Sequence, residues 1–356
     1  MENKKEMTAL DVSAATDTEQ PISKCTDNSI SEKAGKINDL ETISMTELYD
    51  TVYPSKPPLI DGLLYTGTYL FVGAPKLGKS YLMAQLAYHI STGTPLWDYT
   101  VRKGTVLYLA LEDDYRRLQE RLYRMFGTDS TDNLFFSVSA DSLGNGLDAQ
   151  LQRFMQEHTD TSLIIIDTLQ KVREVGGDNY SYANDYEIIT RLKQFADKYG
   201  ICILLVHHTR KQTADDKFNM ISGTTGLLGA ADGAFLLQKE NRTSNAATLE
   251  VSGRDQQDQK LYLNRNTETL LWELERTETE LWKEPADPVL EAIAKVVSEE
   301  KPLWNGTASE LLQLLPDLDM QPNVLTRKLN IGAEQLFVNY GVFYESNRKC
   351  TGRIIK

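Results

Sequence analysis

Cysteine, positive charge and long apolar runs are all scarce in this 356-residue sequence, and each shortage excludes a class of protein. The three cysteines, Cys25, Cys202 and Cys350, lie too far apart for metal-ligand spacing or a disulfide framework, which indicates a reducing compartment. No apolar run approaches the roughly 20 residues that span a bilayer, so we expect a cytoplasmic protein without membrane contact. The net charge of −13 argues against a protein that coats nucleic acid by bulk charge, although it is compatible with a local basic site.

Aromatic residues are missing from residues 1–44, which are rich in Ser, Thr, Asp, Glu and Lys. Such a stretch cannot bury enough apolar surface to offset the entropy lost on ordering, so we expect a disordered acidic tail. Apolar residues make up 41% of the whole chain, which is enough for a real core. The segment "KEPADP" at 283–288 is typical of a linker. It predicts a large domain over 45–284 and a small one over 285–356.

Short β-rich runs alternate with longer helical ones over the large domain, which predicts an α/β fold with a mostly parallel sheet flanked by helices. The later strands follow one another without helices and predict an antiparallel extension at one edge. The predicted strands are 67–73, 104–111, 134–139, 162–167, 201–207, 233–238, 247–253 and 260–264. The predicted helices are 80–91, 115–126, 147–158 and 186–198.

The strongest motif is in "YLFVGAPKLGKSYLMAQLAYHI", which holds G-x-x-x-x-G-K-[ST] between an apolar strand and an apolar-periodic helix. In this setting backbone N–H groups and the helix N-terminus surround phosphate oxygens. Lys79 is expected to reach the β- and γ-phosphates of a nucleotide, and the Ser80 hydroxyl to ligate magnesium. The residues expected to contact the nucleotide are Gly73, Ala74, Pro75, Lys76, Leu77, Gly78, Lys79, Ser80 and Tyr81.

Two acidic residues follow predicted strands. Asp167 ends an apolar strand and is predicted to hold magnesium with Ser80; the alternative is a helix N-cap. Many nucleotide-hydrolysing enzymes place a glutamate next, but here the next residue is Thr168. Glu112 directly follows the strand at 104–111, and ligands gather at the carboxyl ends of parallel strands. Glu112 is therefore predicted to orient the attacking water, unless "LEDD" only opens the next helix, where acids favour the dipole.

The order of motifs resembles the RecA/DnaB superfamily of ring-forming ATPases, and most closely the RepA-like ATPases of plasmids and other mobile elements. The resemblance covers about 60–280 and rests on "LIDGLLYTGTYLFVGAPKLGKS", "LYLALEDD", "IIIDTLQKV" and "LLVHHTRK". It implies a RecA-like fold that binds ATP and Mg²⁺ and assembles into a homo-oligomeric ring, expected to be a hexamer. It also implies that the catalytic base is Glu112.

The resemblance implies roles for two further residues. His208 takes a position that contacts the γ-phosphate and reports its presence to a DNA-binding loop, and a neutral imidazole can donate that hydrogen bond. Alternatively, His207 and His208 simply cap the loop. Arg254 takes the position of an arginine finger that acts on the neighbouring subunit's γ-phosphate, with Lys260 as the second candidate. The alternative for Arg254 is a solvated hairpin arginine.

The resemblance also implies that single-stranded DNA contacts the polar loop "TRKQTADDKFNMISGTTG" at 209–226. Arg210, Lys211 and Lys217 are the residues expected to meet phosphates there. The alternative is a mobile, solvated loop. Arg173, in the segment after Asp167, is a weaker candidate.

The small domain is expected to contain helices around 289–299, 308–315, 322–329 and 331–339, followed by two short strands. This order predicts a winged-helix-like domain. Residues 321–356 hold six Lys or Arg and two Glu, which favours a DNA contact through the last helices and the wing. Winged helices also serve as protein-interaction modules, so both roles stay open.

The sequence thus predicts an ATPase that couples hydrolysis to work on single-stranded DNA. Its most concrete form is a RepA-like ring helicase or ATPase in replication or recombination of a mobile element, with a replication or recombination protein as a further partner. The alternative is an ATP-dependent regulatory switch that binds duplex DNA or a protein partner through the small domain.

Overall fold

The computed structural model describes residues 42–53, 57–173, 182–209, 225–239, 241, 243–254, 256–278, 287–298, 301–349 and 352–355. Contacts divide the chain into two units, 1–48 and 49–356. The described end of the first unit leads into α1 (Met45–Asp50), where the Ser44 and Glu47 side chains cap each other's backbone N–H groups. Among the described helices, none combines the length and apolar character that a membrane span requires.

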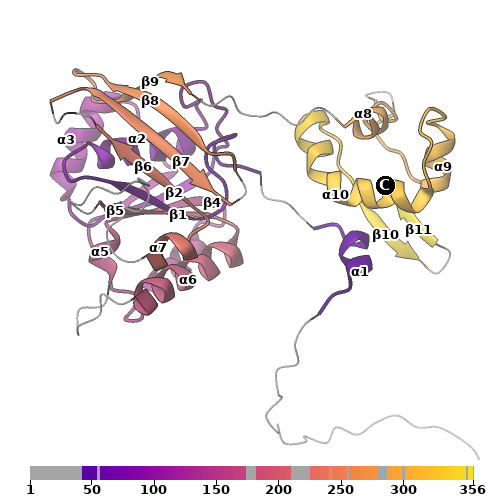
Figure 1. The fold of residues 1–356 in the computed structure, drawn as a ribbon, viewed down its shortest axis with the longest axis horizontal. Coiled ribbons are helices and arrows are strands. Elements are labelled where there is room, and N and C mark those ends of the chain that lie inside the picture. Colours follow the sequence, from indigo (N-terminus) through magenta and orange to yellow (C-terminus); the bar gives the residue numbers. More distant parts are fainter. Residues whose placement is uncertain are drawn as a thin grey trace, which may run out of the picture. The chain divides into compact units, whose positions relative to one another are not determined.

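Nine strands of the described chain form one mixed sheet in the order β3-β2-β4-β5-β1-β6-β7-β8-β9 (Figure 1). Neighbours from β3 to β6 run parallel, and β6 to β9 run antiparallel. The mixed sheet and its antiparallel extension are confirmed. The strands are β1 (Gly67–Gly73), β2 (Thr105–Ala110), β3 (Leu134–Ser137), β4 (Thr161–Asp167), β5 (Cys202–His208), β6 (Gly233–Gln238), β7 (Ala246–Gly253), β8 (Gln259–Arg265) and β9 (Trp272–Thr277).

Helices cover both faces of the sheet because successive strand residues point to opposite sides (Figure 1). In β1, Tyr69 and Phe71 join the core beneath α2 (Lys79–Thr92) and α3 (Tyr115–Phe126). The alternate residues Leu70 and Val72 join a second core on the other face. The helices of that face are α4 (Leu147–Glu157), α5 (Leu169–Val172), α6 (Tyr182–Tyr199) and α7 (Thr225–Ala230). Of the helices that cover this sheet, the four longest are α2, α3, α4 and α6. Each begins and ends within a few residues of its predicted bounds.

Strand β9 is absent from the sequence prediction because it is an edge strand, in which only Trp272 is buried. That residue ties the strand to α2. Gln85 Nε2 donates to Trp272 O at 2.9 Å, and Trp272 N donates to Gln85 Oε1 at 2.8 Å. The Trp97 indole also donates to Trp272 O, at 2.7 Å. The last strand of the sheet is therefore bonded to the helix that follows the P-loop.

The C-terminal part contains α8 (Pro288–Ala294), α9 (Ala308–Gln313), α10 (Pro322–Tyr340), β10 (Ser346–Lys349) and β11 (Gly352–Ile355). Two helices predicted at 322–329 and 331–339 form the single helix α10, so that prediction is wrong. Gly332 does not break the helix. A Cβ at this position would lie 2.8 Å from Leu290 Cδ1, so the glycine allows α10 to pack closely on α8.

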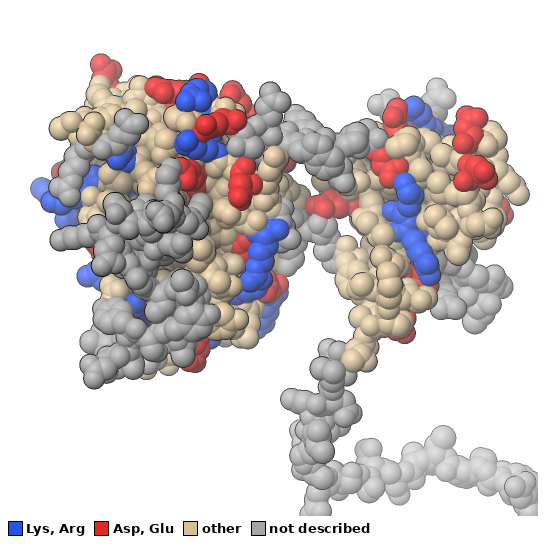
Figure 2. Space-filling view, in the orientation of Figure 1, with Lys and Arg blue, Asp and Glu red and all other residues tan. Residues whose placement is uncertain are grey.

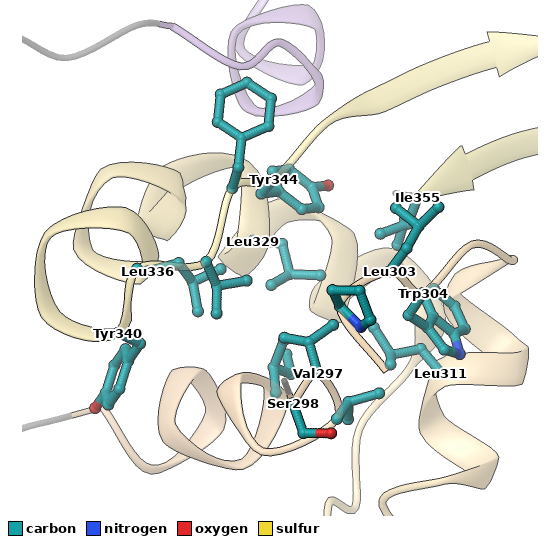
Figure 3. Close-up of a pocket in the computed structure, with 16 residues that line it drawn as sticks. Val297, Ser298, Leu303, Trp304, Leu311, Leu329, Leu336, Tyr340, Tyr344 and Ile355 are labelled. Atoms are coloured by element: carbon teal, nitrogen blue, oxygen red, sulfur yellow. The ribbon is translucent and has the colours of Figure 1, made fainter. Parts of the chain in front are cut away.

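An apolar pocket of about 510 Å³ opens in the C-terminal part and contains none of the P-loop residues (Figure 3). Its lining includes Val297, Leu303, Trp304, Leu329, Leu336 and Ile355. Leu329 and Leu336 are fully buried, whereas Leu303 is 63% exposed at the surface. The pocket is thus an incompletely filled edge of this part's own core.

A buried ion pair joins Arg173, just after α5, to Asp185 in α6, with Nη2 and Oδ1 2.8 Å apart. The two side chains are 8% and 0% exposed. The burial turns Arg173 away from solvent, so the DNA contact considered for it from the sequence does not fit this structure. The pair fixes two chain positions on either side of residues 174–181.

We expect Arg173→Ala to lower the free energy of unfolding by about 3–5 kcal/mol, because it leaves a carboxylate buried without its ion-pair partner. The double change Arg173→Met with Asp185→Leu should recover most of the loss, since it removes both charges. Urea denaturation of the three proteins measures the difference. A loss of less than about 0.5 kcal/mol for the single change, as for an ordinary surface substitution, would contradict this role.

Candidate active site

Four neighbouring strands bring the predicted site residues to one edge of the sheet. In the parallel register Gly73 of β1 lies beside His208 of β5, and Asp167 of β4 lies beside Ala110 of β2. Glu112 follows β2 by two residues. The P-loop, Glu112, Asp167 and His208 therefore leave the carboxyl ends of adjacent strands, where α/β sheets bind ligands.

Two glycines give the P-loop its tight turn. Gly78 precedes α2 with φ +99°, a left-handed conformation that side chains rarely adopt. A Cβ on Gly73 would lie 2.7 Å from Leu237 O in β6, which is closer than side chains tolerate. The loop thus passes directly from β1 into the N-terminus of α2, with the backbone exposed to a ligand. This geometry matches the predicted phosphate cradle.

The Lys79 ammonium is buried at the centre of the site. Its Nζ donates to Gly73 O at 2.7 Å and to Ala74 O at 3.0 Å, and it lies 3.2 Å from His208 Nδ1. Burial lowers the pKa of Lys79 to about 8, although the nearby carboxylates of Asp167 and Glu112 act to raise it. A phosphate group at this place would favour the protonated form and offset the desolvation.

Asp167 is buried and has two hydrogen-bonding neighbours. The Tyr108 hydroxyl donates to Asp167 Oδ2 at 2.9 Å, and the Ser80 side chain hydrogen-bonds to the same carboxyl. Burial raises the pKa of Asp167, while these two hydrogen bonds act to lower it. A divalent cation beside the buried carboxylate would offset its desolvation.

The residues present fit a magnesium site that includes the nucleotide. Mg²⁺ prefers hard oxygen ligands and is usually held by one or two carboxylates together with substrate phosphates. Asp167 and Ser80 supply such oxygens next to the P-loop. Across the described ranges, no cluster of three or more His, Cys, Asp or Glu side chains offers a metal site made of protein alone.

Glu112, the predicted base, and Thr168 are in contact. Glu112 is exposed to solvent at the edge of the site, and the Thr168 hydroxyl donates to its Oε1 at 3.3 Å. Thr168 thus stands where many nucleotide-hydrolysing enzymes carry glutamate, and here it contacts the glutamate of the neighbouring strand. Asp114, not Glu112, caps α3 by accepting from Arg117 N, so the helix-opening alternative applies to Asp114.

His208 is held as a neutral imidazole. Burial and the adjacent Lys79 ammonium both lower its pKa. Because the ammonium can only donate, His208 Nδ1 accepts, and the ring proton is assigned to Nε2. The His208 ring also hydrogen-bonds to the Gly73 backbone, which acts to raise its pKa against these two effects.

Arg254 lies at the opposite edge of the sheet from its own P-loop. It follows β7, whose last residue Gly253 pairs with Gly233 at the start of β6, whereas the P-loop lies beside the end of β6. Arg254 Nη2 donates to Gly229 O at 3.1 Å, and the residue is exposed. Lys260, the second candidate, is ion-paired with Glu278 at 2.8 Å. Of the two, Arg254 is thus the more exposed, and Lys260 is held by an acidic neighbour.

The remaining predicted residues fall in different places. Lys76 and Pro75 are exposed on the P-loop, and Tyr81 lies in the first turn of α2. The nucleic-acid candidates Arg210, Lys211 and Lys217 lie outside the described residues.

Sequence reasoning missed a group of cations and aromatic rings beside the P-loop. The Cζ atom of the Arg265 guanidinium lies over the Tyr81 ring, 4.1 Å from its centroid, and 6.0 Å from the centroid of the Trp272 ring. The Trp272 indole donates to Gly78 O at 3.3 Å. Arg265 and Trp272 come from late strands, so only the lateral order of the sheet brings them to α2. No motif could have found them.

Comparison with known families decides the class. The AAA domain family matches residues 37–214, which is half of the 356-residue chain. The chain belongs to the AAA domain family. With its mixed sheet and P-loop motif, this AAA-domain protein is a P-loop ATPase of the α/β class. None of the curated proteins compared with the chain matches it.

Several solved structures are similar to part of this chain at low sequence identity. A structure described as an ATPase domain has a TM-score of 0.49 and 15% identity, covering 58% of this chain and 84% of its own. A DnaB-like replicative helicase, described with its interactions with primase, has a TM-score of 0.47 and 17% identity, covering 59% and 58%. A KaiC-like protein of the archaeon Pyrococcus horikoshii has a TM-score of 0.45 and 13% identity, covering 63% and 99%.

We expect Glu112→Gln to keep ATP binding and to lower turnover by about 10²–10⁴-fold, because it removes the base that orients water. Lys79→Ala should instead weaken ATP binding, since it removes the ammonium at the centre of the phosphate cradle. Steady-state hydrolysis and equilibrium binding of a fluorescent ATP analogue separate the two effects. Turnover of Glu112→Gln at the unmutated rate would show that another group activates the water.

Proposed function

We propose that this AAA-domain protein assembles into a ring and couples ATP hydrolysis to work on single-stranded DNA. In its most specific form it is a RepA-like helicase or ATPase that acts in replication or recombination of a mobile element, and the ring is a hexamer. ATP and Mg²⁺ bind at the P-loop edge, with Lys79 and His208 on the phosphates and Ser80 and Asp167 on the metal. Glu112 is the catalytic base.

One observation supports the ring proposal: the P-loop and Arg254, the proposed arginine finger, lie at opposite edges of the same sheet. The phosphate cradle, base and metal carboxylate share the edge at the ends of β1, β2 and β4, whereas Arg254 lies at the other edge. An arginine there cannot serve its own P-loop, but it can serve the P-loop of a neighbour packed edge to edge. Repeating that contact in a closed head-to-tail arrangement produces a ring.

The position of His208 supports a coupling to DNA. Its ring lies 3.2 Å from Lys79, and the segment that holds Arg210, Lys211 and Lys217 begins two residues further along the chain. A change in the phosphates at Lys79 therefore acts on a residue next to the proposed DNA-contacting loop.

The second candidate function is an ATP-dependent switch that binds duplex DNA or a protein through the C-terminal part. The order α8, α9, α10, β10 and β11 supports a winged helix, as does the bridge between Gly306 and Ile355 that adds a short strand to the hairpin.

The charges on α10 favour the motor over DNA recognition by this helix. Lys328 Nζ lies 2.8 Å from Asp287 Oδ2, and Arg327 Nε lies 3.6 Å from Asp50 Oδ1. Acidic groups thus lie beside both basic residues that α10 contributes to the predicted DNA contact, whereas the other predicted contacts, Arg348, Lys349 and Arg353, belong to the wing. On the face shown in Figure 2, Lys and Arg are likewise interspersed with Asp and Glu over the described surface.

If Arg254 acts between subunits, Arg254→Ala should still bind ATP but should hydrolyse it poorly. Mixing it with Lys79→Ala should restore part of the activity, because mixed interfaces then combine an intact P-loop with an intact arginine. The measurement is ATPase rate against mixing ratio for co-assembled proteins. No recovery at any ratio would contradict an intersubunit arginine.

The motor predicts that DNA stimulates hydrolysis through the basic loop. Neutralising Lys211 and Lys217 should reduce stimulation by single-stranded DNA and flatten the log–log salt dependence of binding by roughly one or two units. Truncation after residue 284 should leave the stimulation largely intact. The measurements are ATPase rates and salt-dependent binding with single-stranded and duplex oligonucleotides.

The switch predicts the reverse outcome for the same two variants. Its DNA response would be lost on truncation, prefer duplex and survive the loop changes. That result would rule out the motor.

A further inference from the structure

The hydroxyl group of Tyr108 is buried in the core and touches the proposed metal site. Tyr108 lies in the middle of β2, is fully buried, and points to the same face of the sheet as Val106 and Ala110. Its hydroxyl donates to Asp167 Oδ2 at 2.9 Å. Buried tyrosine hydroxyls need a hydrogen-bond partner, and here that partner is the carboxylate expected to face Mg²⁺.

The bond crosses between neighbouring strands, which makes its geometry rigid. Tyr108 pairs with Ile165, and Ala110 pairs with Asp167, so the tyrosine ring reaches two residues along the sheet to the carboxylate. Both strands are fully buried and lie in the parallel core of the sheet. The hydroxyl thereby restrains rotation of the carboxylate, which also hydrogen-bonds to the Ser80 side chain.

The packing of the ring does not require the hydroxyl. The Tyr108 ring lies 5.6 Å from the Phe136 ring in a tilted arrangement that a phenylalanine would also make. A phenylalanine would also spare the cost of burying a polar group. The hydroxyl therefore serves the carboxylate and not the core.

We propose that Tyr108 is a positioning residue for the metal site, whose hydroxyl holds the Asp167 carboxylate in the orientation that receives Mg²⁺ with Ser80. This inference rests on the proposed nucleotide site, since it takes Asp167 as the metal carboxylate. Groups that orient metal ligands from behind typically change metal affinity by 10–100-fold when they are removed.

The experiment compares binding of Mn²⁺, as a spectroscopic substitute for Mg²⁺, to the full chain in the presence of saturating ADP. In Tyr108→Phe, Mn²⁺ affinity measured by electron paramagnetic resonance should fall at least about tenfold. Affinity for ADP without metal should stay within about twofold, because the phosphate cradle is unchanged. The control Phe136→Leu disturbs the ring packing but keeps the hydroxyl, so its Mn²⁺ affinity should match the unmutated protein.

Asp167→Asn separates failure of this inference from failure of the proposed site. If unmutated protein binds Mn²⁺ with ADP and Asp167→Asn does not, the site is correct, and unmutated affinity in Tyr108→Phe would then overturn the role of the hydroxyl. If Asp167→Asn keeps full Mn²⁺ affinity, the proposed metal site itself is wrong, and this inference fails with it.

Should Tyr108→Phe not fold, 3-fluorotyrosine at position 108 provides the same test. It keeps the ring and makes the hydroxyl a stronger donor, so Mn²⁺ affinity should change by a measurable factor. Unchanged affinity would overturn the inference.

Discussion

The arrangement of the candidate site depends on the buried ammonium group of Lys79, which lies where the carboxyl ends of four parallel strands meet. It donates to two P-loop carbonyls and contacts His208 of the neighbouring strand, within the field of Asp167 and Glu112. Burial of a cation costs desolvation free energy, and only nearby hydrogen-bond acceptors and carboxylates offset this cost. The parallel register of β1, β5, β4 and β2 supplies them, because it brings their carboxyl ends to one edge. The P-loop lysine and the carboxylates of Asp167 and Glu112 therefore depend on one another for their charge balance.

The same sheet separates this edge from Arg254. Because β7 runs antiparallel to β6, Arg254, which follows β7, lies at the edge of the sheet where β6 begins. A residue that stabilises charge on a γ-phosphate contributes only where it reaches that phosphate, so under the proposed function one chain holds parts of two sites. The rate of ATP hydrolysis would then depend on contact between subunits as well as on bound ATP.

Local patterns in the sequence predicted the P-loop, most of the strands and the strand ends that carry Glu112 and Asp167, because each depends on residues close together in the chain. The structure does not test the roles predicted for these residues. Strand β9 was missed because an edge strand with one buried residue has little apolar signal. The pairing of Arg173 with Asp185 and the bond from Tyr108 to Asp167 were missed for another reason. Both depend on the lateral packing of elements, which no spacing in a single sequence specifies.

The bonds between Gln85 and Trp272 have a mechanical consequence. Strand β9 is the last element of the sheet before the chain leaves for the C-terminal part, and it is attached both to β8 and to the middle of α2. The Trp272 indole also reaches the carbonyl of Gly78 at the first turn of that helix. Tension applied to the chain beyond β9 therefore acts first on the pairing of β9 with β8 and then, at Trp272, on the helix that follows the P-loop.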